Sequence, residues 1–126
     1  MKIEVSVGEI IDKMTILSIK ENKISDEKKR KNVSEENTYL KKILDDAGLI
    51  EKFSHEIQEL TKINQILWDI EDNIREKELH KQFDSEFIEL ARSVYMTNDK
   101  RFEVKRKINE MSNSSFKEEK SYAKYN

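Results

Sequence analysis

The chain has 126 residues, enough for one domain, of which 40% are charged and 36% hydrophobic, and its net charge is −2. It contains no cysteine, no proline and only two glycines, which excludes a disulfide framework and a thiolate metal site and favours long helices over turn-rich β structure. No overall basic field exists to attract nucleic acid or an anionic membrane, and no apolar run approaches the roughly 20 residues that span a bilayer. We therefore expect neither nucleic acid nor a membrane as a partner. The N-terminus lacks a signal-peptide core, so a cytoplasmic location is expected.

The first predicted helix follows a short extended segment. Lys2–Val7 alternates polar and apolar residues, a pattern typical of extended structure. Ser6 and Glu9 then have the spacing of a capping box, which begins a helix expected to run from about Val7 to Ile24. Its apolar residues fall on two faces, so both faces should pack against protein.

A charged run separates this helix from the second one. Residues Ser25–Asn32 (SDEKKRKN) are predicted to form a solvated loop. Ser34 is the next expected N-cap, and Gly48 suits the left-handed position that ends a helix. The second helix is therefore placed between these two residues.

The two longest predicted helices cover about residues 50–79 and 84–111, with Asp84 as the N-cap of the later one. The short turn between them predicts an antiparallel arrangement. The predicted fold class is all-α: a long antiparallel helical hairpin packed with two shorter N-terminal helices and a short extended N-terminal segment. We expect one domain, 1–126, in which the polar and aromatic tail, 115–126, is docked.

The long hairpin predicts self-association. Two helices of this length with so few apolar residues cannot bury much surface by themselves. The two N-terminal helices must cover part of them, and a second subunit is expected to cover more. A homodimer built on the hairpin is therefore the expected assembly.

Polar residues interrupt the apolar stripes of both long helices. In this antiparallel hairpin, the numbers of two residues that face each other should add up to roughly 165. This places Asn98 near Trp68 and Arg101 opposite Asn64. Buried polar groups are costly unless paired, so these residues need partners. Two interpretations stay open: a mutual polar network, or a pocket in which three cations and one carboxylate leave positive charge for an anion. The candidate ligand-binding residues are Asn64, Trp68, Glu71, Arg75, Arg92, Asn98, Arg101 and Lys105.

Four stretches resemble an uncharacterised family of small helical proteins from bacteria and phages that carries a domain of unknown function. They are VSVGEIIDKMTIL (5–17), LWDIEDNIREKE (67–78), ARSVYMTNDKRFEVKRKIN (91–109) and EEKSY (118–122). The resemblance covers nearly the whole chain. It implies one intracellular domain without an assigned activity, and it names no catalytic residue.

Other chemistry is less well supported by the sequence. Glu56 and Glu59, followed by Asp69 and Asp72, resemble the Mg²⁺-binding carboxylates of all-α nucleotide pyrophosphohydrolases. Ten helical residues separate the two pairs by about 15 Å, so only a dimer interface could bring them to one ion. The two histidines are predicted to form surface charge pairs, and the basic run 100–107 a solvated helix face. No metal site and no cofactor are expected.

Two hypotheses about function follow. In the first, the chain is a non-enzymatic helical protein that acts by self-association and partner binding through the long hairpin and the tail. In the alternative, it is a small-molecule binder or enzyme that holds a phosphate or carboxylate with Arg75, Arg101 and Lys105, while Glu71 and Asn98 orient the ligand. Catalytic residues cannot be assigned, and whether the chain is an enzyme stays open. A Mg²⁺-dependent nucleotide pyrophosphohydrolase is a remote alternative.

Overall fold

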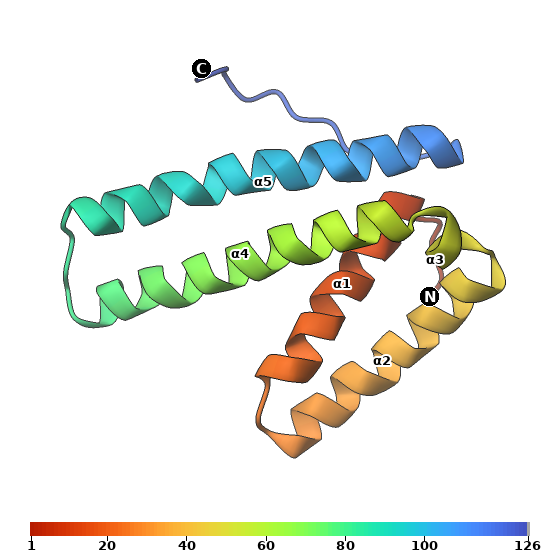
Figure 1. Ribbon diagram of the computed structural model, residues 1–126, viewed down its shortest axis with the longest axis horizontal. Helices are drawn as coiled ribbons and strands as arrows, with labels where there is room; N and C mark the ends of the chain where they lie inside the picture. The colour runs from red at the N-terminus through yellow and green to blue at the C-terminus, as the bar shows by residue number, and fades with distance from the viewer. Residues whose placement is uncertain (126) are drawn as a thin grey trace.

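The computed structural model describes residues 1–125, and Asn126, the last residue of the predicted tail, lies outside the described residues. The described residues form five helices and no strand: α1 (Val7–Lys23), α2 (Glu27–Asp46), α3 (Leu49–Lys52), α4 (Ser54–Leu79) and α5 (Ser85–Ser112). Figure 1 shows two helical hairpins, α1–α2 and the longer α4–α5, that meet near α3 and diverge from there like the limbs of a V. The predicted all-α fold with a long antiparallel hairpin is confirmed.

Two predicted helix starts are confirmed by their capping contacts. The Ser6 hydroxyl accepts a hydrogen bond from the backbone N–H of Glu9 at 3.3 Å, and Asp84 accepts one from Phe87 at 3.0 Å. Gly48 has the expected positive φ of 73°. These contacts join residues a few positions apart, which is why the sequence alone predicts them.

The charged run 25–32 is largely helical, and the prediction of a solvated loop is wrong. α2 begins at Glu27, because Asp26 caps it by accepting from the backbone N–H of Lys29 at 2.9 Å. Ser34 lies within the helix and is not its N-cap. Lysine, arginine and glutamate are good helix formers, so an earlier cap extends the helix through the whole run.

The predicted helix 50–79 is interrupted near its start. The short α3 ends before Phe53, whose backbone has φ −108° and ψ 26°, and α4 begins at Ser54. Phe53 is 0% exposed and belongs to the central core. Burial of this large side chain at the interruption offsets the helical hydrogen bonds that a continuous helix would have made.

The core lies where the two hairpins meet. Its fully packed members come from α1, α2, α4 and α5 and from Phe53: Ile11, Met14, Leu44, Phe53, Leu60, Val104 and Ile108. At this junction α1 approaches α5 so closely that a Cβ on Gly8 would lie 2.7 Å from the carbonyl oxygen of Lys105. The Gly8 N–H donates to Asn109 Oδ1 at 2.7 Å, and the Val7 N–H donates to the Ser114 hydroxyl at 3.0 Å.

The far half of the long hairpin has no comparable core. Within residues 71–96 no side chain is buried. We call this part of α4, the turn and α5 the arm. None of the described helices is both long enough and apolar enough to cross a membrane.

Candidate functional site

A buried carboxylate lies at the centre of the junction. Asp12 on α1 is 1% exposed, and its Oδ1 accepts hydrogen bonds from Asn64 Nδ2 at 2.9 Å and from Arg101 Nε at 3.0 Å. Arg101 Nη2 donates to the second oxygen, Oδ2. Three helices therefore meet on one carboxylate, which is held by two parallel guanidinium bonds and an amide.

The partners of Asp12 are themselves fixed. Asn64 Nδ2 also donates to the Thr15 hydroxyl at 2.9 Å, and that hydroxyl donates to the backbone carbonyl of Asp12 at 2.7 Å. The hydrogen bond with Asp12 is the main reason that the pKa of Arg101 lies above its ordinary value. The guanidinium thus stays charged, and its orientation is set by buried groups.

Lys105 lies beside this cluster. Its Nζ is 2.9 Å from carboxylate oxygens of both Glu9 and Glu118, and 4.0 Å from Asp12 Oδ2. Burial disfavours the charged form of Lys105, but the hydrogen bonds to Glu118 and Glu9 outweigh it, so the pKa of Lys105 lies above its usual value. The lysine connects the start of α1 to the C-terminal tail.

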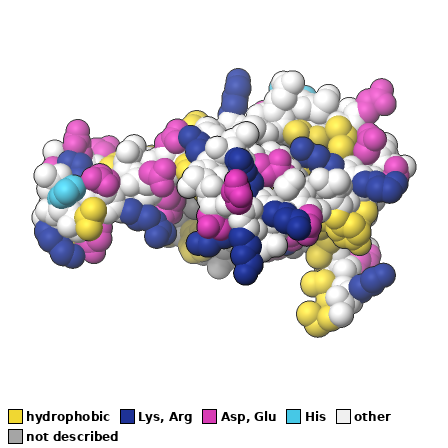
Figure 2. Space-filling view, turned by 90° about the horizontal axis from the view of Figure 1, so that it is seen from below, with side chains coloured by type: hydrophobic (Ala, Val, Ile, Leu, Met, Phe, Trp, Pro, Cys, Tyr) yellow, Lys and Arg dark blue, Asp and Glu magenta, His cyan; other side chains and the backbone are white. Residues whose placement is uncertain are grey.

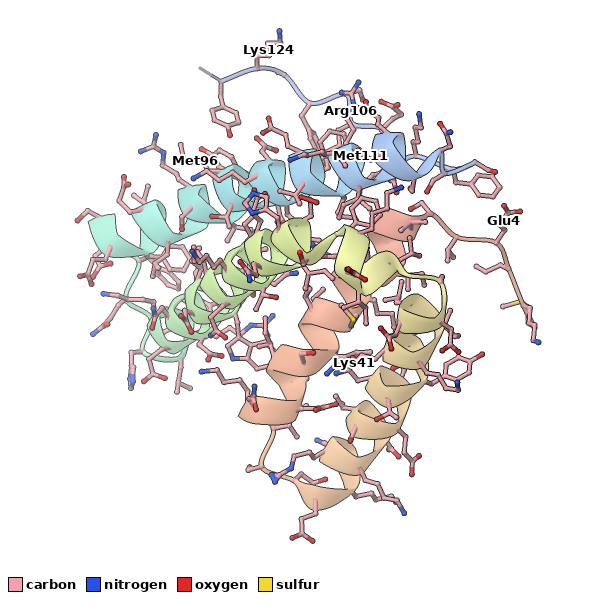
Figure 3. All side chains as sticks on the ribbon, turned by 45° about the vertical axis from the view of Figure 1, so that its right-hand side comes forward. Glu4, Lys41, Met96, Arg106, Met111 and Lys124 are labelled. Atoms are coloured by element: carbon pink, nitrogen blue, oxygen red, sulfur yellow. The ribbon has the colours of Figure 1, made fainter. Side chains whose placement is uncertain are left out.

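An open cleft of about 570 Å³ borders the Asp12 cluster, between α1, α4 and α5. Figure 3 shows side chains of α1 and α4 pointing into the angle between the two hairpins. One wall of the cleft is apolar, from Ile16, Ile19, Leu67 and Trp68. The remaining lining residues are Asn64, Glu71, Asp72, Arg75, Asn98 and Arg101.

The structure brings together most of the predicted ligand-binding residues. Those that line the cleft are Asn64, Trp68, Glu71, Arg75, Asn98 and Arg101. Lys105 contacts Asp12 but is not part of the lining. Arg92 lies on the arm, where it pairs with Glu89 at 3.0 Å, and does not line the cleft.

The expected excess of positive charge is absent from the described residues around this cluster. Arg101 is paired with Asp12, and Lys105 is paired with Glu9 and Glu118. The prediction of excess positive charge rests on the two long helices alone, and none of these three carboxylates belongs to them. The interpretation of a mutual polar network is therefore closer to the geometry, and any anion must bind beside paired cations.

The carboxylates compared with a pyrophosphohydrolase motif all lie on α4, which is continuous from Ser54 to Leu79. Glu56 is buried, with Lys107 Nζ 3.9 Å from its carboxylate, and His55 lies 3.0 Å from Glu59. Side-chain ligand atoms of His55, Glu56 and Glu59 lie within 4.8 Å of one another and could hold a metal ion. The separation of about 15 Å from Asp69 and Asp72 along the helix axis remains.

The arm carries exposed apolar side chains at its tip. Leu79 is 71% exposed, Phe83 57% and Ile88 55%, and Phe83 packs edge-on against Phe87 with ring centres 5.2 Å apart. Lys77 on α4 forms ion pairs across the turn, with Nζ 2.9 Å from the Asp84 carboxylate and 2.7 Å from the Glu86 carboxylate. Figure 2 shows the arm as the narrow projection on the left, with charged side chains beside hydrophobic ones.

The described part of the C-terminal tail runs back along the outer side of α5 (Figure 1). The Tyr125 hydroxyl donates to Asp99 at 2.6 Å, and the rings of Tyr125 and Tyr95 lie 5.2 Å apart. Lys120 Nζ lies 5.3 Å from the centre of the Phe102 ring. These contacts follow a stripe of α5 that faces away from α4.

A model for a family of unknown function, DUF6165, matches residues 1–125. The chain belongs to this family. The resemblance to an uncharacterised family is thereby confirmed, and the family assigns no activity to the DUF6165 chain. No curated protein and no solved structure matches it.

Proposed function

We propose that this chain acts by binding protein surfaces through the arm, and that its first partner is a second copy of itself. One observation supports the proposal: within residues 71–96 no side chain is buried, although the segment carries large apolar residues. A helix pair buries only the stripe along which its two helices touch. The other apolar side chains remain available to a partner.

A second helical hairpin would suit this surface. Two hairpins that pack together form a four-helix bundle, in which each helix has two neighbours. Apolar burial contributes roughly 25 cal/mol per Å², so residues such as Leu79, Phe83 and Ile88 would stabilise the assembly once they are covered. The same surface could accept an amphipathic helix of another protein.

Sedimentation of the purified chain across the micromolar range tests the proposal. We expect the wild-type chain to be a dimer and Ile88→Asp to sediment as a monomer, since a charge cannot be buried unpaired at the interface. Tyr39→Asp is the matched control, because Tyr39 is 63% exposed on α2, outside the arm. A wild-type chain that stays monomeric throughout, or a dimer that Ile88→Asp leaves intact, contradicts the proposal.

A second candidate function is the binding of a small anion in the cleft. It is favoured by the way Arg101 uses its hydrogen-bond donors. Its Nε and Nη2 bind Asp12, while Nη1 has only a long contact of 3.5 Å with Asn98 Oδ1. The edge formed by the two Nη atoms is therefore the one that remains for a ligand.

Thermal unfolding with inorganic phosphate, acetate or hexanoate, each at constant ionic strength, tests this second candidate. A ligand that binds only the folded chain raises its melting temperature in proportion to its concentration and affinity. We expect a rise with at least one of these anions. No rise with any of them would contradict anion binding.

A further inference from the structure

We infer that the cleft between α1, α4 and α5 binds a monocarboxylate that carries an apolar group. This inference rests on the second candidate function and narrows it to one ligand class. Three features of the cleft support it: the orientation of one guanidinium, the signs of the surrounding charges and the composition of the walls.

The orientation of Arg101 favours a carboxylate. The two bonds to Asp12 hold the guanidinium plane and use Nε and one hydrogen of Nη2, while Nη1 makes only the 3.5 Å contact with Asn98. The neighbouring edge, between Nη1 and Nη2, therefore keeps hydrogens for a ligand. A planar carboxylate can accept both of these donors at once, which is the geometry that Arg recognises best. Asn98 lies next to this edge, and its side-chain Nδ2 donates to no residue that the structure describes, so it can donate to the same ligand.

The surrounding charges favour a single negative charge over two. Arg101 is already paired with Asp12, and Arg75 is paired with Glu71 at 3.2 Å. Asp72 adds a further carboxylate to the lining. Asp12, Glu71 and Asp72 against Arg75 and Arg101 leave one negative charge in excess, so a phosphate dianion would meet twice the net repulsion that a monocarboxylate meets.

The walls favour an apolar group on the ligand. Ile16, Ile19, Leu67 and Trp68 face the same space as Arg101. The volume of about 570 Å³ is within the range of small-molecule sites, which combine apolar walls with a few polar groups that fix the ligand. A carboxylate bound at Arg101 would thus direct an alkyl or aryl group along Trp68.

Trp68 provides a direct measurement, because it is the single tryptophan of the chain. Titration with hexanoate should change its fluorescence in a saturable way. Hexanamide, which has nearly the same shape but no charge, should bind at least about tenfold more weakly, because it cannot form two charge-assisted bonds to Arg101. Acetate, which lacks most of the apolar group, and inorganic phosphate should also bind at least about tenfold more weakly than hexanoate.

Two variants locate the site. Arg101→Lys keeps a cation beside Asp12 but removes the two-donor edge, and it should weaken hexanoate binding by about tenfold or more. Arg106→Lys is the matched control, because Arg106 forms an exposed pair with Glu110 and is not part of the cleft lining. Ile16→Phe fills the apolar side of the cleft and should also weaken binding, while circular dichroism checks that each variant is folded.

The outcomes separate this inference from the function on which it rests. If phosphate or acetate binds as tightly as hexanoate, anion binding stands and the inference is wrong. If hexanamide binds as tightly as hexanoate, the role assigned to Arg101 is wrong. If hexanoate binds to Arg101→Lys as well as to the wild-type chain, the site lies elsewhere. If no anion changes the fluorescence or the melting temperature, both proposals fail.

Discussion

The two ends of the long hairpin differ in what surrounds them. At the junction, α4 packs against α1 and α3, α5 packs against α1, and side chains such as Phe53, Leu60 and Ile108 are 0% exposed. In the arm, the same two helices pack mainly on each other, the tail adds Tyr125 against Tyr95, and no side chain is buried between residues 71 and 96. Stability should therefore come mainly from the junction, while the arm leaves large apolar side chains exposed.

The largest effect is expected from a substitution in the packed core of the junction. Phe53→Ala should destabilise the fold by about 3–5 kcal/mol, because it leaves a cavity in the packed core. Phe83→Ala removes the same group from the tip of the arm and should cost less than about 1 kcal/mol in the monomer. Urea unfolding of both variants measures the difference, and equal losses would show that the arm has a core of its own.

A smaller effect is expected when the polar centre of the junction loses its cation. Arg101→Met leaves the buried Asp12 carboxylate with the Asn64 amide and, 4.0 Å away, the Lys105 ammonium, which should cost about 3 kcal/mol. Arg75→Met removes an exposed partner of Glu71 and should change stability by less than about 0.5 kcal/mol. Chemical denaturation compares the two variants. An Arg101→Met chain as stable as the wild type would mean that the Asp12–Arg101 pair does not stabilise the junction.

Lys105 should have an effect of about 1 kcal/mol. Lys105→Met removes hydrogen bonds to Glu9 and Glu118, whose carboxylates can turn to water, so the loss is modest. Because the folded pKa of Lys105 lies above 10.5, its contribution is complete below that value and is lost as the pH rises through the folded pKa. The free energy of unfolding, measured across this alkaline range, should fall less steeply in Lys105→Met than in the wild-type chain.

The smallest expected effect concerns the tip of the arm. The hydrogen bond from Lys77 is the main cause that lowers the pKa of Asp84 below 3.8. Asp84 therefore stabilises the turn above pH 3.8, and this contribution is lost as the pH falls through its folded pKa. Amide hydrogen exchange at the tip should increase in acid, and Lys77→Met should shift the increase to a higher pH. An acid response that Lys77→Met leaves unchanged would contradict this pairing.

Short-range features account for what the sequence could predict. The caps at Ser6 and Asp84 and the left-handed Gly48 depend on residues a few positions away. The antiparallel register also placed Asn64 opposite Arg101, and both side chains indeed contact Asp12. Such inferences need only helix periodicity and one turn.

The centre of the candidate site required a long-range contact that periodicity does not provide. Asp12 lies one and two turns before Ile16 and Ile19, on the second apolar face of α1, so its position on a buried face was a signal in the sequence. Which cation it meets depends on the angle at which α1 crosses the long hairpin. The interruption at Phe53 likewise depends on the shape of the core and not on local residue preferences.

The close approach at Gly8 determines when the chain can complete its fold. The first turn of α1 is bonded to Asn109 and Ser114, which are more than a hundred residues further along the chain. During synthesis on the ribosome, α1 can pack against α2 and then α4 as they follow it, but its first turn lacks these hydrogen-bond partners until the last turn of α5 has been made. A nascent chain that stops before residue 109 therefore lacks the contact that fixes the start of α1.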